Sequence, residues 1–129
     1  HLDNASDAGI KKIAASDTVA VLLPGASLFI GTPYPQARTL IDQGARVALS
    51  TDYNPGTCPS RNLPLMTTLA CSQMKMTIPE AIVGITYNAA AALGLEDKLG
   101  SIGVGKQFRV CQLKGSSYEV LPYSFGELS

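Results

Sequence analysis

The sequence predicts an α/β fold, because two apolar runs that suit strands flank a pattern that suits a helix. The runs cover 18–23 and 46–50, and each is short, continuous and rich in Val, Ala and Leu. Between them, Ala37, Leu40 and Ile41 share one helical face. Strand, helix and strand in this order form a βαβ unit, so we expect parallel strands with a right-handed connection.

Local signals define the elements around the first strand. A helix is expected over 6–15, where capping residues come first and Ile10 and Ile13 lie on one face. The run 18–23 stops at Pro24, and its unbroken apolar character predicts a strand buried on both faces. A loop rich in Pro and Gly is expected to follow it.

Two helices are predicted after the second strand. Residues 63–74 carry regularly spaced apolar side chains, and Pro64 stands in the first turn, where its missing N–H costs nothing. Thr77 and Glu80 have the spacing of a capping box. They open a helix that we expect to run through 81–93.

The last third of the chain changes character. Glycines punctuate 100–105, and the segments 108–113 and 118–121 have a β-like composition. Two parallel strands do not form a stable isolated sheet, so the α/β part is incomplete. We infer that 1–95 are the C-terminal portion of a larger (β/α)8 barrel and that 96–129 are part of a small accessory β-sandwich domain.

The composition limits the classes of protein to which this chain can belong. The 129 residues are 46% hydrophobic and balance ten basic against ten acidic side chains, which indicates a globular chain without a nucleic-acid-binding charge. No apolar run approaches the roughly 20 residues of a membrane span. Three widely spaced cysteines and one histidine give no disulfide or zinc-finger pattern. We expect no nucleic-acid or membrane partner, a cytoplasmic location and, from the initial His, a chain cut from a longer one.

Asp52 is the residue that most needs a functional explanation. It closely follows the run 46–50, and ligands of parallel α/β folds bind beyond the carboxyl ends of the strands. The alternative is structural, because an Asp here could cap the turn formed by Asn54, Pro55 and Gly56. That turn could also bind a carboxylate or amide ligand through its backbone N–H groups and the Asn54 amide.

Other polar and sulfur side chains have simpler interpretations. Met66, Met74 and Met76 suit the core better than a metal site, because no cysteine or histidine cluster accompanies them. Cys58 lacks a second histidine that could activate it as a nucleophile. His1, taken alone, would be assigned no role.

Several segments of the chain resemble the imidazolonepropionase family of the amidohydrolase superfamily. They follow the order and approximate spacing of that family, and they are 1–3 (HLD), 21–25 (VLLPG), 50–57 (STDYNPGT), 76–81 (MTIPEA), 86–90 (TYNAA), 100–106 (GSIGVGK) and 121–126 (LPYSFG). The loop at 50–57 is the specific part of the match. The segments at 86–90 and 100–106 mark the superfamily more broadly.

The resemblance implies a metal-dependent enzyme with a (β/α)8 barrel. Such an enzyme hydrolyses the cyclic amide 4-imidazolone-5-propanoate to N-formimidoyl-L-glutamate in histidine degradation. One Zn or Fe ion per chain acidifies a bound water, and the resulting hydroxide attacks the ring carbonyl. The expected partner is this small-molecule substrate, and the full-length protein is expected to be a homodimer.

The resemblance also assigns roles to five residues. It implies that Asp52 ligates the metal and takes the proton of the attacking water. It implies that His1 polarises the ring carbonyl or stabilises the developing oxyanion. Asn54 and Gly56 correspond to positions that contact the glutamate portion of the product, and Thr57 to one that touches the substrate. The other metal ligands lie upstream in the family, so this chain alone should not catalyse.

Three alternatives stay open at this stage, and the simplest is a bare α/β domain without function, which the match over several segments disfavours. Another cyclic amidohydrolase or a deaminase of the superfamily would share Asp52 but should lack the loop that follows it. A non-catalytic fragment or degenerate homologue would have a binding or structural role and no metal.

Overall fold

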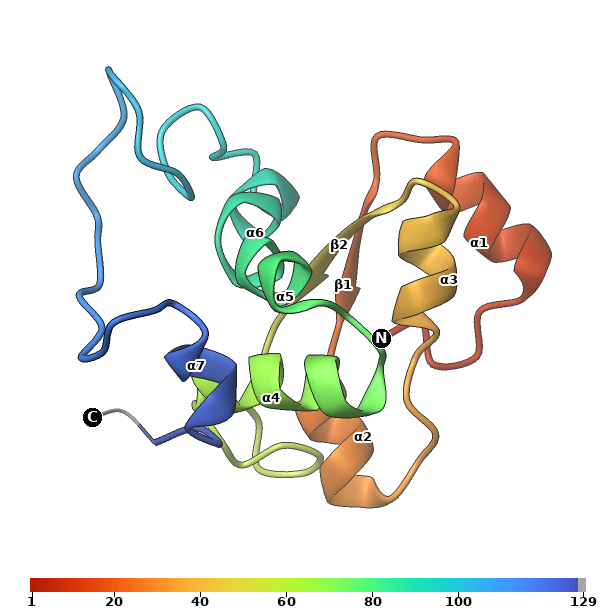
Figure 1. Cartoon of the computed structure of the whole chain (residues 1–129). Helices are drawn as coiled ribbons and strands as arrows, with labels where there is room; N and C mark the ends of the chain where they lie inside the picture. Colours follow the sequence, from red (N-terminus) through yellow and green to blue (C-terminus); the bar gives the residue numbers. More distant parts are fainter. Residues whose placement is uncertain (128–129) are drawn as a thin grey trace.

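The computed structural model describes residues 1–127 as short helices around a two-stranded sheet (Figure 1). In chain order the elements are α1 (Asp7–Ala14), β1 (Val19–Leu22), α2 (Pro24–Ile30), α3 (Ala37–Asp42), β2 (Arg46–Leu49), α4 (Leu63–Gln73), α5 (Ile78–Ile85), α6 (Tyr87–Ala92) and α7 (Val120–Tyr123). In Figure 1 the strand pair lies between α1 and α3 on one side and α5 and α6 on the other. The predicted α/β class is confirmed.

The two strands pair in parallel, as the βαβ pattern predicts. Val19 lies opposite Arg46 and Leu22 lies opposite Leu49, so the strands end at the same edge. Beyond the ladder, the backbone N–H of Ser50 donates to the Leu22 carbonyl at 3.1 Å. Both chain segments that leave this edge are therefore held together at their start.

The connection between the strands contains α2, a helix that the sequence analysis assigned to a loop. Pro24 marks the end of the strand, but it also suits the first turn of a helix, where it stands in α2. The helix ends at Gly31, whose φ of +71° is the left-handed conformation of a C-terminal cap. Pro24 and Gly31 thus mark the two ends of a short helix.

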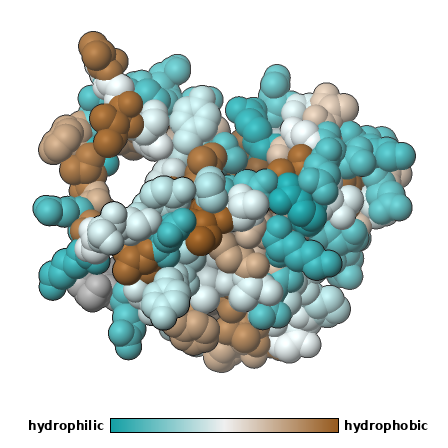
Figure 2. Space-filling model, viewed as in Figure 1, coloured by the Kyte–Doolittle hydropathy of each residue, from teal (hydrophilic) through white to brown (hydrophobic). Residues whose placement is uncertain are grey.

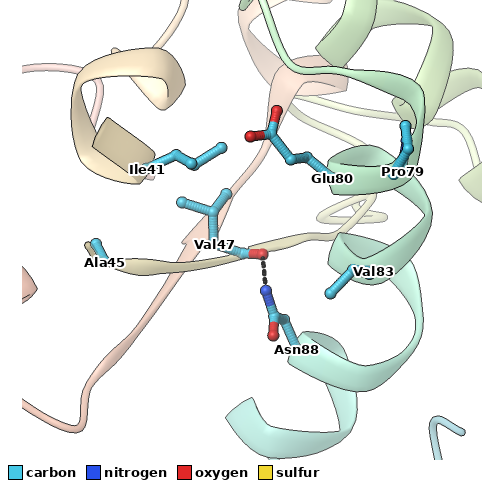
Figure 3. A pocket seen from close by; sticks show the side chains of 7 residues that line it. All are labelled: Ile41, Ala45, Val47, Pro79, Glu80, Val83 and Asn88. Carbon is cyan, nitrogen blue, oxygen red and sulfur yellow. Dashed lines mark hydrogen bonds between the residues drawn. The ribbon is translucent and has the colours of Figure 1, made fainter. Parts of the chain in front are cut away.

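The helix predicted through 81–93 is instead two helices, α5 and α6. The break is at Thr86, which has φ −121° and ψ −92° and whose hydroxyl donates to the Ile82 carbonyl at 2.7 Å. Just after it, Asn88 Nδ2 donates to the Val47 carbonyl at 2.8 Å (Figure 3). These side-chain bonds end one helix and anchor the next one to β2. The predicted capping box of Thr77 and Glu80 is present at the start of α5.

The core fills the space between the strand pair and the helices. Ile10 of α1 and Leu22 of β1 are among its fully buried side chains. Met66, Met74 and Met76 are also buried, which confirms their prediction as core residues. Removing side chains of this size from water is the main force that holds such elements together.

One burial prediction is wrong. The strand β1 alternates between half-buried Val19 and Val21 and buried Ala20 and Leu22, so it is not buried on both faces. Within residues 1–127, no element completely covers the face that carries the two valines. In β2, by contrast, Val47 and its two successors are all buried.

The predicted strands of the last third do not form. Residues 108–113 have no regular secondary structure, and 118–121 overlap α7, which packs against α4. A strand needs a neighbour for its backbone hydrogen bonds, and residues 96–127 contain none. Phe108 and Val104 remain exposed, and hydrophobic residues, coloured brown, lie on the surface of this part of the chain in Figure 2. The division into 1–95 and 96–129 stays a prediction, and residues 128 and 129 lie outside the described part.

A cluster of charges joins α3 to α5. Arg38 donates to both carboxylate oxygens of Glu80, at 2.9 and 3.0 Å, and to Asp42 at 2.9 Å. Glu80 Oε2 also accepts from the Thr77 backbone N–H at 2.7 Å. The hydrogen bonds from Arg38, supported by those from Thr77, lower the Glu80 pKa from 4.5 to about 2, although burial opposes the shift.

The lowered Glu80 pKa gives a stability prediction. The contribution of this carboxylate is complete above its unfolded pKa of 4.5 and is lost as the pH falls toward its folded pKa of about 2. We expect Glu80→Gln to lower the free energy of unfolding at pH 7 by about 1 kcal/mol, a value reduced for the exposure of the pair. Urea unfolding should show that the difference from wild type disappears between pH 4.5 and 2. Asp42→Asn, at the exposed end of the cluster, is the control and should have a smaller effect.

Candidate active site

The candidate site lies at the common carboxyl-terminal edge of β1 and β2. Asp52 leaves this edge at the end of β2, and the N-terminus lies beside it (Figure 1). The amino nitrogen of His1 donates to the Val21 carbonyl at 3.3 Å, which holds the start of the chain along β1. As a result His1 Nε2 comes within 3.7 Å of Asp52 Oδ2. The structure thus brings together the two residues that the sequence analysis proposed as catalytic.

The backbone of Asp52 has the left-handed conformation, with φ at +52°. This conformation is uncommon outside glycine, and Asp and Asn adopt it more readily than other residues. The residue is partly exposed, and its Oδ1 accepts no hydrogen bond within residues 1–127. A carboxylate presented in this way has a free oxygen for a proton or a cation.

The loop after Asp52 is organised by the Asn54 side chain. Its Oδ1 accepts from the N–H groups of Gly56 and Thr57, at 2.8 and 2.7 Å. Its Nδ2 donates to the Asp52 carbonyl at 2.6 Å and to Thr57 Oγ1 at 2.8 Å. The backbone N–H of Asn54 also donates to the Cys58 carbonyl at 3.0 Å. The turn interpretation of this sequence is therefore confirmed, while its binding role stays a prediction.

His1 has a second acidic neighbour that the sequence analysis missed. Asp3 Oδ2 lies 3.5 Å from His1 Nδ1, so carboxylates face both nitrogens of the imidazole. The signal in the sequence was a carboxylate two residues after the histidine. The backbone turns between the two residues, because Leu2 has a φ of +62°.

A second pair that the sequence analysis missed lies on the outer side of the loop. The Arg61 guanidinium carbon stands 4.4 Å from the centre of the Tyr53 ring, and its Nη2 donates to the Tyr53 hydroxyl at 3.3 Å. A cation over an aromatic face is a modest stabilising contact at an exposed site. It ties the end of the loop to the residue next to Asp52.

The metal expected from the resemblance can be tested against these residues. The partly exposed Asp52 carboxylate, with its free oxygen, fits as one ligand of a zinc or iron ion. Zinc sites need at least three protein ligands, and residues 1–127 contain no group of three His, Cys, Asp or Glu side chains arranged to hold a metal. Asp52 therefore does not complete such a site within residues 1–127, and its role as a ligand stays a prediction.

The hollow drawn in Figure 3 is a different region. It lies between α3, β2 and α5, and Ile41, Val47 and Val83 are among its lining residues. Its single carboxylate, Glu80, is engaged by Arg38. A mainly apolar hollow without a free reactive group is less suited to chemistry than the Asp52 edge.

A family model described as the amidohydrolase family matches residues 1–113. The chain belongs to this family. It is 48% identical over 126 residues to the imidazolonepropionase of Parabacteroides distasonis and 46% identical over 129 residues to that of Bdellovibrio bacteriovorus. These alignments cover 98% and 100% of this chain, so the resemblance to imidazolonepropionases is confirmed. The chain spans 30% of the length of each of these relatives.

Solved structures of two deaminases share the fold of this chain. An adenosine deaminase from Xanthomonas campestris with bound zinc matches with a TM-score of 0.78 at 23% identity. The guanine deaminase of E. coli matches with a TM-score of 0.73 at 18% identity. Each match covers 84% of this chain and 26% of the other one. The prediction that the α/β part is a portion of a (β/α)8 barrel is confirmed at the level of fold.

The Asn54 network predicts a local stability effect. Replacing Asn54 with Ala removes the acceptor of two backbone N–H groups and the donor to the Asp52 carbonyl. We expect the free energy of unfolding to fall by about 2 kcal/mol, because several partly buried groups lose their partners. Urea unfolding followed by circular dichroism measures the change. Asn4→Ala, at an exposed position, is the matched control, and an equal effect of the two substitutions would contradict the role of the network.

Proposed function

We propose that the full-length protein containing this chain hydrolyses 4-imidazolone-5-propanoate to N-formimidoyl-L-glutamate, a step of histidine degradation. One observation carries the proposal. His1 and Asp52, which lie in the matching segments 1–3 and 50–57, meet at the strand edge in a chain nearly half identical to imidazolonepropionases. The proposal is specific because the loop from Asp52 to Thr57 is the part of the resemblance that distinguishes this family.

The proposed reaction breaks the C–N bond of the ring amide. A zinc or iron ion, when bound, supplies Lewis acidity toward water and the carbonyl. Asp52 would be one of its ligands and would accept a proton from the attacking water. His1 would polarise the ring carbonyl or, by donating from Nε2–H, stabilise the negative charge that develops on its oxygen. The proton returns to the leaving ring nitrogen, the new carboxylate forms, and the formimidoyl group stays on the amine.

The loop that follows Asp52 holds the acidic part of the ligand. We assign Asn54 and Gly56 to contacts with the glutamate portion and Thr57 to the substrate. The hydrogen bonds within the loop fix its shape in advance, so little conformational entropy is lost when a ligand binds. Gly56 is exposed and has no side chain, which allows close approach to its backbone.

The remaining assignments rest on the family resemblance. We propose a small-molecule substrate, a homodimer and a cytoplasmic location for the full-length protein. Among the helices of residues 1–127, none has the length and hydrophobicity needed to cross a membrane.

The proposal is tested on the full-length protein with 4-imidazolone-5-propanoate as substrate. Asp52→Asn should reduce kcat at least about 1,000-fold and lower the bound zinc or iron, because it removes a proton acceptor and an anionic ligand. Steady-state kinetics and metal analysis measure both effects. Asp97→Asn, at an exposed position far along the chain, is the control and should match wild type. Wild-type turnover of a cyclic amidine instead of the imidazolone would favour a deaminase, and no turnover of either would favour a non-catalytic role.

His1 and Asp52 are expected to differ in one measurable way. His1→Gln should lower kcat about 100-fold or more, because the oxyanion loses a positioned stabilising group. The metal content should stay at the wild-type level, since we assign Asp52 and not His1 as a ligand. Loss of metal together with activity in His1→Gln would contradict this division of roles.

A further inference from the structure

The segment 121–127 is a part of the chain to which the proposed function gives no role. It lies against α4, and Figure 1 shows α7 beside that helix. Thr68 Oγ1 donates to the Pro122 carbonyl at 2.7 Å, and Asn62 Nδ2 donates to the Gly126 carbonyl at 2.6 Å. The two bonds join residues that are 54 and 64 positions apart in the sequence. The segment 121–127 is therefore fixed at two points along α4.

The second of these contacts requires a glycine at position 126. Gly126 is buried, and its φ of +85° is a left-handed conformation that glycine adopts without steric cost. A Cβ atom added there would lie 2.5 Å from Asn62 Nδ2 and 2.9 Å from Leu65 Cβ. The missing side chain thus allows the backbone of Gly126 to approach Asn62 closely enough for the hydrogen bond.

Asn62 connects this contact to the loop that follows Asp52. It is the N-cap residue of α4, where its Oδ1 accepts from the Leu65 backbone N–H at 3.0 Å. It is also the last residue of the irregular linker 59–62, which leads from the loop 52–58 to α4. Within residues 1–127, its bond to Gly126 is the one side-chain hydrogen bond that joins this linker to a segment distant in sequence.

The linker in turn holds the far end of the loop. Arg61, next to Asn62, donates to the Tyr53 hydroxyl at 3.3 Å and stands over the Tyr53 ring. Cys58 is buried, and its carbonyl accepts from the Asn54 backbone N–H at 3.0 Å. The start of the loop is fixed separately by the strand edge. The position of the far end therefore depends on the linker and on what holds the linker.

We propose that Asn62 is a positioning residue that holds the loop 52–58 in its ligand-binding shape through the bond to the Gly126 carbonyl. The inference rests on the proposed function for its kinetic consequence, since that function assigns Asn54, Gly56 and Thr57 to the ligand. A loop that is ordered before binding loses little conformational entropy when the ligand binds. Without the bond to Gly126, the ligand itself has to order the loop, so its affinity falls.

The first test measures hydrogen exchange by mass spectrometry on the full-length protein. Asn62→Asp keeps an oxygen that caps α4 but removes the donor to Gly126. We expect the amides of residues 53–58 to exchange at least about fivefold faster in this variant, because the loop opens more readily. Thr68→Val removes the other bond to the segment 121–127 and leaves the linker intact, so this matched control should keep the wild-type rate. Unchanged exchange in Asn62→Asp, or equal acceleration in both variants, overturns the proposal.

The second test is kinetic. Asn62→Asp should raise KM for 4-imidazolone-5-propanoate about 10-fold and change kcat less than about threefold, because the loss weakens the binding of substrate and transition state alike. Gly126→Ala should have the same effect without adding a charge, since its Cβ atom would displace the segment from Asn62. The double variant should be no worse than either single one, because both substitutions break the same contact. Additive effects in the double variant, or a wild-type KM in Asn62→Asp, would overturn the proposal.

The two tests separate the inference from the proposed function. If the wild-type protein does not turn over 4-imidazolone-5-propanoate but exchange in 53–58 responds to Asn62→Asp and not to Thr68→Val, the proposed function fails and the anchoring of the loop is supported. If the enzyme is active and neither exchange nor KM responds, the function stands and the inference is overturned. Should Asn62→Asp not fold, as judged by circular dichroism, Gly126→Ala decides by the same two measurements, because it leaves the cap of α4 in place.

Discussion

The parallel pairing of β1 with β2 is the constraint on which the rest of the structure depends. Because the strands run in the same direction, both of their carboxyl ends emerge at one edge. The hydrogen bond from Ser50 to Leu22 extends the pairing beyond the ladder, and the bond from the His1 amine to Val21 adds the start of the chain to the same edge. These backbone contacts bring His1 and Asp52 to the same edge.

Contacts among the helices and with the strands fix the position of this edge. Arg38 and Glu80 join α3 to α5, and the Asn88 amide fixes α6 to the carbonyl of Val47 in β2. Buried apolar side chains supply most of the stabilisation, whereas these polar contacts set the positions of the helices relative to the strands. The catalytic candidates can therefore lie on short segments beyond the strands and still have defined positions. The loop also has a defined position, because Asn54 accepts hydrogen bonds from the backbone N–H groups of Gly56 and Thr57.

The final third of the described chain differs from the part that contains the two strands. Phe108 and Val104 expose large apolar surfaces, while α7 is attached to α4 by the hydrogen bond from Thr68 to the Pro122 carbonyl. A β-like composition becomes a strand only where another strand completes its hydrogen bonds, and residues 96–127 contain no such neighbour. The same dependence on partners applies to the candidate site, because one carboxylate is too few for a zinc site and further protein ligands would have to complete it.

The sequence by itself determined the local features: the apolar runs of the strands, the capping box of Thr77 and Glu80, the turn built on Asn54, and the motif that marks Asp52. These features depend on residue types and on their spacing over a few positions, and both are read directly from the sequence. Tertiary structure decided the break at Thr86 and the meeting of His1 with Asp52. It also decided the contact of Asn62 with Gly126 and the absence of strands from the last third of the described chain. Each of these depends on contacts between distant segments, and such contacts exist only once the strands have paired and the helices have packed.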